Sequence, residues 1–126
     1  MRSVRLHVTS HEPPFESEQH PLSRRWAVVE DDGDVAWLYL TAPESVKPAA
    51  ACFLYNQSDA PAGQSGNSIH FRWSIDGNSV AVLFSDLIMG FIVDAKRPGF
   101  SHMLKVEGAL GSPMDTALYE RIFRAT

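Results

Sequence analysis

The sequence predicts an α+β fold: a mainly antiparallel β-sheet meander of about six or seven strands, with a short C-terminal helix packed on it. Three observations support this prediction. Apolar side chains alternate with polar ones at Ile69, Phe71 and Trp73, which is the period of a strand with one buried face. Asp-Gly pairs separate apolar runs, as in β-hairpins, and apolar residues near the C-terminus recur at helical spacing. The 126 residues are expected to form a single domain, residues 1–126.

The N-terminal segment predicts one strand followed by a loop. Val4, Leu6 and Val8 alternate with polar residues, which indicates a strand with one buried face. Residues 10–23 are polar and contain three prolines, so a long surface loop is expected there. A loop of that length in a compact domain is either functional or mobile.

A hairpin is expected around Gly33. Residues 25–30 and 35–41 are apolar, β-branched or aromatic runs on either side of an Asp-Gly turn, for which a type I′ conformation is typical. Because residues 35–40 are almost continuously apolar, this second strand is expected to be central and covered on both faces.

The apolar run 49–55 is compatible with either a helix or a strand, because periodicity does not separate the two in a short run. Residues 56–67 are rich in glycine, serine and glutamine and predict a loop. The single cysteine, Cys52, lies inside the apolar run and is expected to be a buried, inert thiol.

A three-stranded meander is expected over residues 69–93. Its strands are residues 69–73, 80–84 and 87–93, joined by short turns. Residues 96–99, Lys-Arg-Pro-Gly, are expected to end it.

The C-terminal helix is predicted from its capping residues and its apolar spacing. Ser112, Pro113 and Asp115 form a helix start, with proline at the first helical position. Leu118 and Ile122, with their aromatic neighbours, supply the apolar face that packs on the sheet.

Composition and charge argue against several classes of protein. The net charge of −4 and the isoelectric point near 5.6 are unlike those of a nucleic-acid-binding protein, and no Lys/Arg run exceeds the pair Arg24–Arg25. No segment has the length of a signal peptide's hydrophobic region or of a membrane span. The chain is therefore expected to be cytoplasmic and to bind neither nucleic acid nor membrane.

No pattern of catalytic or metal-binding residues stands out. The five histidines form no HxH, HxxxH or HExxH pattern, and one cysteine excludes a multi-cysteine zinc site; the histidines are His7, His11, His20, His70 and His102. Neither a P-loop nor a GxSxG motif occurs. The sequence predicts a protein that is not an enzyme, with no catalytic residue, no metal ligand and no cofactor.

The densest charge cluster in the chain is acidic and lies at the predicted hairpin. It consists of Glu30, Asp31, Asp32 and Asp34. Asp and Gly suit turn geometry by themselves, so a structural role accounts for these residues. A second interpretation is an acidic patch that binds a protein with a basic face. A calcium loop would need ligands over about twelve residues, and the sequence becomes apolar directly after Asp34.

Two stretches resemble a small, functionally uncharacterised bacterial domain family. Residues 26–39 contain Glu-Asp-Asp-Gly in an aromatic hairpin, and residues 73–83 contain Trp-Ser-Ile-Asp-Gly followed by an apolar strand. The likeness spans residues 25–95. The sequence departs from the family pattern at residues 34–36, Asp-Val-Ala in place of Glu-Thr-Gly, and at residues 87–91, where relatives have Asn-Gly-Tyr-Pro-His.

The resemblance implies an immunity protein of a bacterial toxin system of the contact-dependent growth inhibition type. Such a protein binds and neutralises a cognate toxin domain, for example a nuclease, and works as a monomer or weak homodimer. An acidic inhibitor would be steered toward a basic, nucleic-acid-binding toxin surface. The partner-binding residues expected on this basis come from three turns: Glu30, Asp31, Asp32, Asp34, Asp76 and Asp86.

Two other functions stay open. One is a small-molecule-binding domain or small enzyme that uses His11 and His20, or His70; two titratable side chains converging in a deep pocket would favour it. The other is a structural or regulatory subunit that associates with itself through an exposed strand edge.

Overall fold

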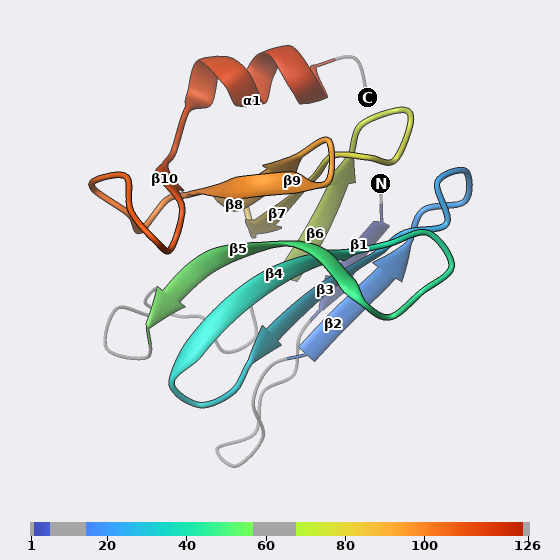
Figure 1. Cartoon of the computed structure of the whole chain (residues 1–126), viewed down its shortest axis with the longest axis horizontal. Coiled ribbons are helices and arrows are strands. Elements are labelled where there is room, and N and C mark those ends of the chain that lie inside the picture. Colours follow the sequence, from blue (N-terminus) through green and yellow to red (C-terminus); the bar gives the residue numbers. More distant parts are fainter. Residues whose placement is uncertain (1, 6–14, 57–67, 125–126) are drawn as a thin grey trace.

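The computed structural model describes residues 2–5, 15–56 and 68–124 and arranges them in two β-sheets and one helix (Figure 1). The elements in chain order are β1 (Arg2–Arg5), β2 (Phe15–Gln19), β3 (Trp26–Asp31), β4 (Val35–Thr41), β5 (Pro48–Asn56), β6 (Ser68–Trp73), β7 (Val80–Phe84), β8 (Leu87–Val93), β9 (Lys96–Ser101), β10 (Ser112–Pro113) and α1 (Thr116–Phe123).

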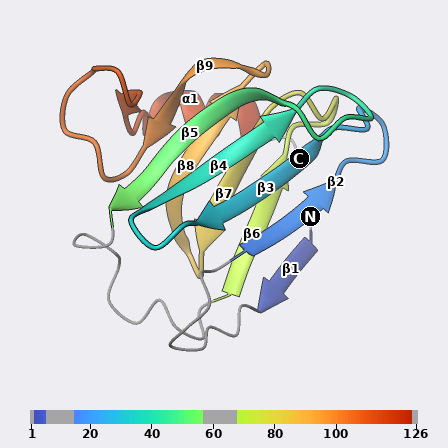
Figure 2. The same cartoon turned by 60° about the horizontal axis from the view of Figure 1, so that its bottom comes forward.

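The two sheets form a sandwich. A four-stranded sheet has the order β2-β3-β4-β5, and a six-stranded sheet has the order β1-β6-β7-β8-β9-β10. All pairings are antiparallel except the short parallel contact of β10 with β9. Figure 2 shows the four-stranded sheet in front of the six-stranded one, with α1 behind both. The predicted α+β class, with antiparallel sheets and a C-terminal helix, is confirmed.

The apolar core has two parts. The larger part fills the space between the sheets and includes Leu38, Leu54 and Phe71. The smaller part lies between the six-stranded sheet and α1, where Phe91, Tyr119 and Phe123 contact one another through their rings. Burial of these side chains is the main favourable term in folding, and it explains why α1 is held on the outer face of that sheet.

The expected hairpins and the three-stranded meander are present, and the ambiguous run 49–55 lies within strand β5. The turn at Gly33 is not of type I′, because Gly33 alone has a positive φ there. The turn at Asp94–Ala95, between β8 and β9, has positive φ at both residues, which is the type I′ signature. The predicted strand over residues 4–8 corresponds to β1 as far as Arg5, and the rest of it lies outside the described residues.

Two segments expected to be irregular are strands. Within the predicted 10–23 loop, β2 pairs with β3 over its whole length; its polar sequence hid it, because an edge strand needs little apolar surface. Residues 96–99, expected to end the meander, begin β9 instead. Pro98 is tolerated there because it falls in an irregular stretch, between the Val93–Lys96 and Phe91–Phe100 pairs.

The helix begins one turn later than Pro113 suggested. Asp115 is the N-cap, and its side chain accepts the N–H of Leu118 at 3.0 Å. Pro113 is not the first helical residue, as predicted, but belongs to β10. Arg72 holds the other end of α1 by donating to the Phe123 carbonyl at 2.9 Å, which complements the negative end of the helix dipole.

Glycines set how closely the sheets approach. A Cβ on Gly99 of β9 would lie 2.9 Å from the Cα of Cys52 in β5, and one on Gly90 would lie 2.8 Å from the sulfur of Cys52. The sandwich can therefore close tightly on the β5–β9 side only because these residues have no side chain. Burial raises the pKa of the Cys52 thiol to about 12, in keeping with the expected inert cysteine.

Candidate functional site

The acidic hairpin is divided by its geometry into one buried carboxylate and three exposed ones. Asp31 is 1% exposed; its carboxylate accepts the Tyr55 hydroxyl at 3.1 Å and the Gly33 N–H at 2.9 Å. Glu30, Asp32 and Asp34 are exposed. The burial of Asp31 follows from strand alternation, because β3 turns every second side chain toward the core. Only the three exposed residues can meet a partner.

Asp32 also has a turn function. Its carboxylate accepts the N–H groups of Asp34 and Val35, both at 2.9 Å. These backbone donors lower the pKa of Asp32, so it is charged throughout the neutral range. Asp32 therefore both stabilises the turn and adds a negative charge to the surface.

The remaining predicted contacts, Asp76 and Asp86, lie at opposite ends of the sandwich. Asp86 is exposed and follows Phe84, whose ring contacts Tyr55 at a centroid distance of 6.0 Å. It therefore lies at the same end as the acidic hairpin. Asp76 is in the β6–β7 turn at the other end, where its carboxylate accepts the Ser74 hydroxyl at 2.7 Å and the Asn78 N–H at 3.0 Å. These bonds lower the pKa of Asp76, and the residue does not join the acidic hairpin.

The outer face of the four-stranded sheet is apolar and only partly covered: Phe53 on this face is 4% exposed, whereas its cross-strand neighbour Trp37 is half-buried. Strand β4 was expected to be covered on both faces, and this is wrong: Ala36, Leu38 and Leu40 are buried, whereas Val35, Trp37 and Tyr39 remain partly exposed. We call this outer surface the open face; its members on β3, β4 and β5 are Trp26, Val28, Glu30, Val35, Trp37, Tyr39, Ala51 and Phe53. A sheet face made mainly of aromatic and aliphatic side chains is rarely left exposed to solvent.

Aromatic and acidic side chains are neighbours on the open face. Glu30 is the cross-strand partner of Trp37, and the Trp37 and Tyr39 rings stack at a centroid distance of 6.4 Å. Partial burial, and then the charges of Glu30 and Asp32, raise the pKa of Tyr39. The Tyr39 hydroxyl is therefore within range of the hairpin charges, and the pairing of Glu30 with Trp37 places acidic and aromatic side chains next to each other on the sheet.

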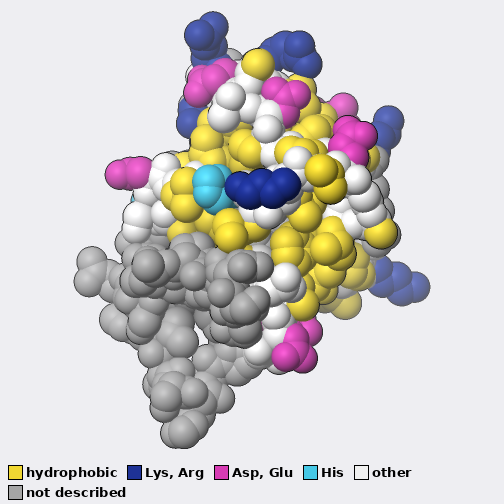
Figure 3. Space-filling model, turned by 90° about the vertical axis from the view of Figure 1, so that its left-hand side faces the viewer, with side chains coloured by type: hydrophobic (Ala, Val, Ile, Leu, Met, Phe, Trp, Pro, Cys, Tyr) yellow, Lys and Arg dark blue, Asp and Glu magenta, His cyan; other side chains and the backbone are white. Residues whose placement is uncertain are grey.

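A hollow adjoins the open face. It has a volume of about 510 Å³ and lies between the Trp37–Tyr39 pair and the turn 108–111. In Figure 3, which views the side of the molecule where the segment around β10 lies, hydrophobic side chains form a broad area. Acidic side chains lie at the margin of that area, and a histidine and a basic side chain lie across its middle.

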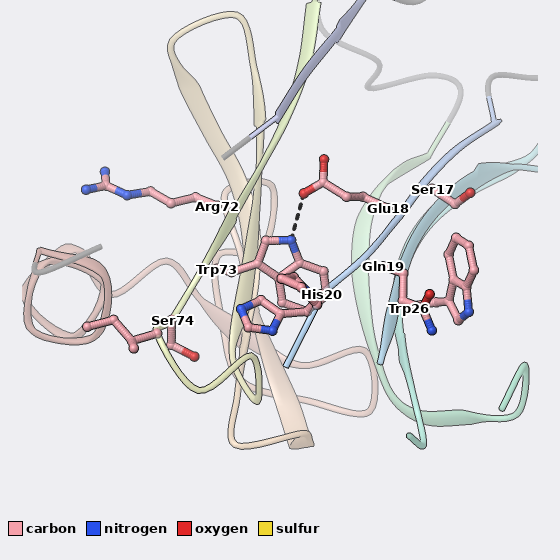
Figure 4. Close-up of a pocket in the computed structure, with 10 residues that line it drawn as sticks. Ser17, Glu18, Gln19, His20, Trp26, Arg72, Trp73 and Ser74 are labelled. Atoms are coloured by element: carbon pink, nitrogen blue, oxygen red, sulfur yellow. Dashed lines mark hydrogen bonds between the residues drawn. The ribbon is translucent and has the colours of Figure 1, made fainter. Parts of the chain in front are cut away.

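A second cavity, the cleft, opens between the sheets on the side away from the β5–β9 contact. Its volume is about 1060 Å³, and it is lined by consecutive residues of β2 and by the end of β6. The Glu18 carboxylate accepts the Trp73 indole N–H at 2.8 Å (Figure 4). The second carboxylate oxygen of Glu18 is buried and has no hydrogen-bond partner within the described residues. Arg72 points away from Glu18, toward α1.

His20 closes one end of the cleft and is 8% exposed. Its Nδ1 accepts the N–H groups of Leu22 and Ser23 at 3.1 and 3.2 Å, so the neutral ring carries its proton on Nε2. The ring packs on Trp73 at 5.1 Å. A Cβ on Gly77 would collide with this imidazole, so the Asp-Gly turn of β6–β7 needs glycine both for its positive φ and for this close approach.

The environment of His20 predicts a pH effect on stability. Burial lowers the pKa of His20, and the charges of Asp76 and Glu18 oppose this only partly. The unfolded chain, with a histidine pKa of about 6.5, then binds a proton more readily than the folded one. The contribution of His20 is complete above pH ~6.5 and declines as the pH falls below that value.

We expect His20→Asn to remove this dependence, because the amide oxygen keeps an acceptor near Nδ1 but does not titrate. The measurement is the free energy of unfolding by urea between about pH 5 and 7.5. The pKa values of Asp32 and Asp76 are lowered, so these two turn carboxylates stay charged across this range. Parallel curves for the variant and the original chain would contradict the assignment.

Within the described part of the chain, no three His, Cys, Asp or Glu side chains gather in a way that could hold a metal ion. Among the same residues, no helix has the length and apolarity needed to cross a membrane. The histidines His7 and His11 lie outside the described residues, and His70 and His102 line neither cavity.

Comparisons of the chain with models of protein families, with curated proteins and with solved structures found no match.

Sequence reasoning missed both cavities and the open face. Glu18 and His20 were within a segment expected to be a loop, so their convergence with Trp73 was not visible. Along β4, the residues of the open face alternate with Ala36, Leu38 and Leu40 of the core. Because both sets are apolar, the sequence shows no contrast between an exposed and a buried face.

Proposed function

We propose that this chain is an immunity protein that binds and neutralises a cognate bacterial toxin domain of the contact-dependent growth inhibition type. It would act in the cytoplasm, without catalysis, as a monomer or weak homodimer that binds its partner through the open face and the acidic hairpin. The observation that carries the proposal is the proximity of Glu30 and Asp32 to the partly exposed Trp37–Tyr39 pair.

This combination suits a protein interface for two physical reasons. Aromatic side chains are enriched at the centre of interfaces, where they lose water completely on binding. Carboxylates beside them raise the rate of encounter with a basic surface and select against acidic ones. A nuclease toxin presents such a basic surface to nucleic acid.

The test is co-expression of the chain with the toxin domain encoded by the gene immediately upstream. We expect the cells to survive, and the two proteins to co-purify with nanomolar affinity. Cell death at full expression of the chain, together with no binding by calorimetry, would contradict the proposal.

The cleft favours a second function, small-molecule binding, because Glu18 and His20 approach one cavity between the Trp26 and Trp73 side chains. Both groups already have structural hydrogen bonds, to Trp73 and to the 20–23 turn, which makes this the weaker candidate. Screening a fragment library by the indole N–H shift of Trp73 tests it. Saturable shifts that disappear in Glu18→Gln would support it, and their absence would exclude it.

A further inference from the structure

We propose that the hollow is an anchor site: it takes one apolar side chain of the partner protein, while a basic residue beside that side chain pairs with Glu30 and Asp32. The inference rests on the proposed function and specifies the chemistry that the partner must present.

The hollow is built into the backbone and does not result from a chance gap. Its floor is formed by small residues, among them Ala51 of β5 and Gly99 of β9. Gly99 must lack a side chain because of Cys52, and a Cβ on Gly111 would lie 2.6 Å from the Gly99 carbonyl oxygen. Gly111 also has a φ of +134°, which other residues rarely adopt. The tight β5–β9 contact therefore keeps this space free of side chains.

The walls of the hollow are apolar. Trp37 and Tyr39 form one wall, with Phe53 supporting Trp37 edge-on at a centroid distance of 5.9 Å. Leu110, 45% exposed, stands at the rim of the opposite wall. None of the described residues that line the hollow carries a charge. An apolar group entering it would lose water against rings on one side and a leucine on the other, at about 25 cal/mol per Å² of apolar surface buried.

The charged residues near the hollow indicate which kind of partner segment it would bind. The Trp37–Tyr39 pair separates the hollow from Glu30 and Asp32, whose charges reach the Tyr39 hydroxyl. The charges that the structure places beside the Trp37–Tyr39 wall are therefore the acidic ones of the hairpin. A partner segment with an apolar residue next to arginine or lysine matches both features, and arginine can in addition stack on an aromatic ring.

The test uses the full ¹⁵N-labelled chain and four blocked dipeptides as probes: leucyl-arginine, phenylalanyl-arginine, leucyl-glutamate and alanyl-arginine amides. We expect saturable shifts of the Trp37 indole N–H with the first two. Replacing the arginine or the apolar residue should weaken binding by about tenfold each, the factor that 1.4 kcal/mol represents. Equal binding of all four probes, or no saturable shift at Trp37, would overturn the proposal.

Two variants of one strand supply the control. Ala51→Leu fills the hollow, whereas Ala49→Leu adds the same side chain at an exposed position of β5 outside it. We expect Ala51→Leu to lose the leucyl-arginine shift and Ala49→Leu to keep it, with both chains folded by circular dichroism. Leu110→Ala at the rim should weaken binding without any risk to the core. Undiminished binding in both Ala51→Leu and Leu110→Ala would refute the anchor site.

The same variants separate this proposal from the proposed function. If the upstream toxin domain binds Ala51→Leu as tightly as the original chain but binds a charge-reversed hairpin weakly, the anchor site is wrong and the inhibitor function stands. If the dipeptides bind as expected and the toxin domain does not bind, the site is right and the assigned partner is wrong.

Discussion

Reversing two charges at the hairpin, with Glu30→Lys and Asp34→Lys together, is expected to slow association with the toxin domain by roughly 10- to 100-fold at low salt, the range over which electrostatic steering acts. Both side chains are exposed and neither is used by the turn bonds of Asp32, so the fold should be unchanged. Stopped-flow association rates at several salt concentrations measure the effect. The dependence on salt should also become weaker, because fewer opposite charges are screened.

The matched control reverses two charges on the opposite side of the molecule. Glu120→Lys lies on α1, and Asp115 should be avoided because it caps that helix. Glu120→Lys combined with Glu44→Lys, in the exposed β4–β5 turn at the end of the sheet away from the hairpin, gives the same change in net charge as the hairpin variant. If this control slows association as much as the hairpin variant does, the effect comes from net charge, and the hairpin has no special part in recognition.

Substituting Asp31 is expected to have the largest effect on stability of any change at the hairpin. Asp31→Ala removes the buried carboxylate that accepts the Tyr55 hydroxyl and the Gly33 N–H. Gly33 is exposed, so its N–H can bond to water, whereas losing the buried bond to Tyr55 costs about 1–3 kcal/mol. We expect the free energy of unfolding to fall by roughly 1–3 kcal/mol. Urea unfolding monitored by tryptophan fluorescence measures the loss.

Asp34→Ala is the comparison for Asp31→Ala, since it removes an exposed carboxylate three positions along the chain. Its effect on the free energy of unfolding should be small, because exposed substitutions away from caps and cores change stability little. The opposite order of the two losses would mean that Asp31 is not the residue that holds the hairpin on Tyr55. Asp31→Lys is likewise unsuitable as a probe of binding, because it would put a long cationic side chain in place of the buried acceptor of the Tyr55 hydroxyl.

The sequence predicted the parts of this fold that depend on local pattern. The Asp-Gly hairpins, the meander of β6, β7 and β8, and the C-terminal helix each carry their signal within about ten residues. Strand β2 was missed because its sequence, Phe-Glu-Ser-Glu-Gln, has little apolar character and its strand state depends on pairing with β3. Strand propensity is more dependent on context than helix propensity.

The candidate site was predictable only in part. Sequence placed four acidic residues at one turn, but whether each carboxylate faces solvent depends on strand alternation and on Tyr55, which is 24 residues away from Asp31 along the chain. The open face and the hollow arise from contacts between β5 and β9, far apart in the chain, and from glycines whose necessity appears only in three dimensions. Asp76 and Asp86 looked equivalent in sequence, yet they lie at opposite ends of the sandwich.

The most direct test of the central claim is hydroxyl-radical footprinting of the chain with and without the upstream toxin domain. If the open face is the interface, oxidation of Trp37 and Tyr39 falls several-fold in the complex, while Leu22 and Ile75, which are 72% and 66% exposed near the cleft, keep their rates. Protection of Leu22 and Ile75 with no change at Trp37 and Tyr39 would contradict the account and place the partner at the cleft.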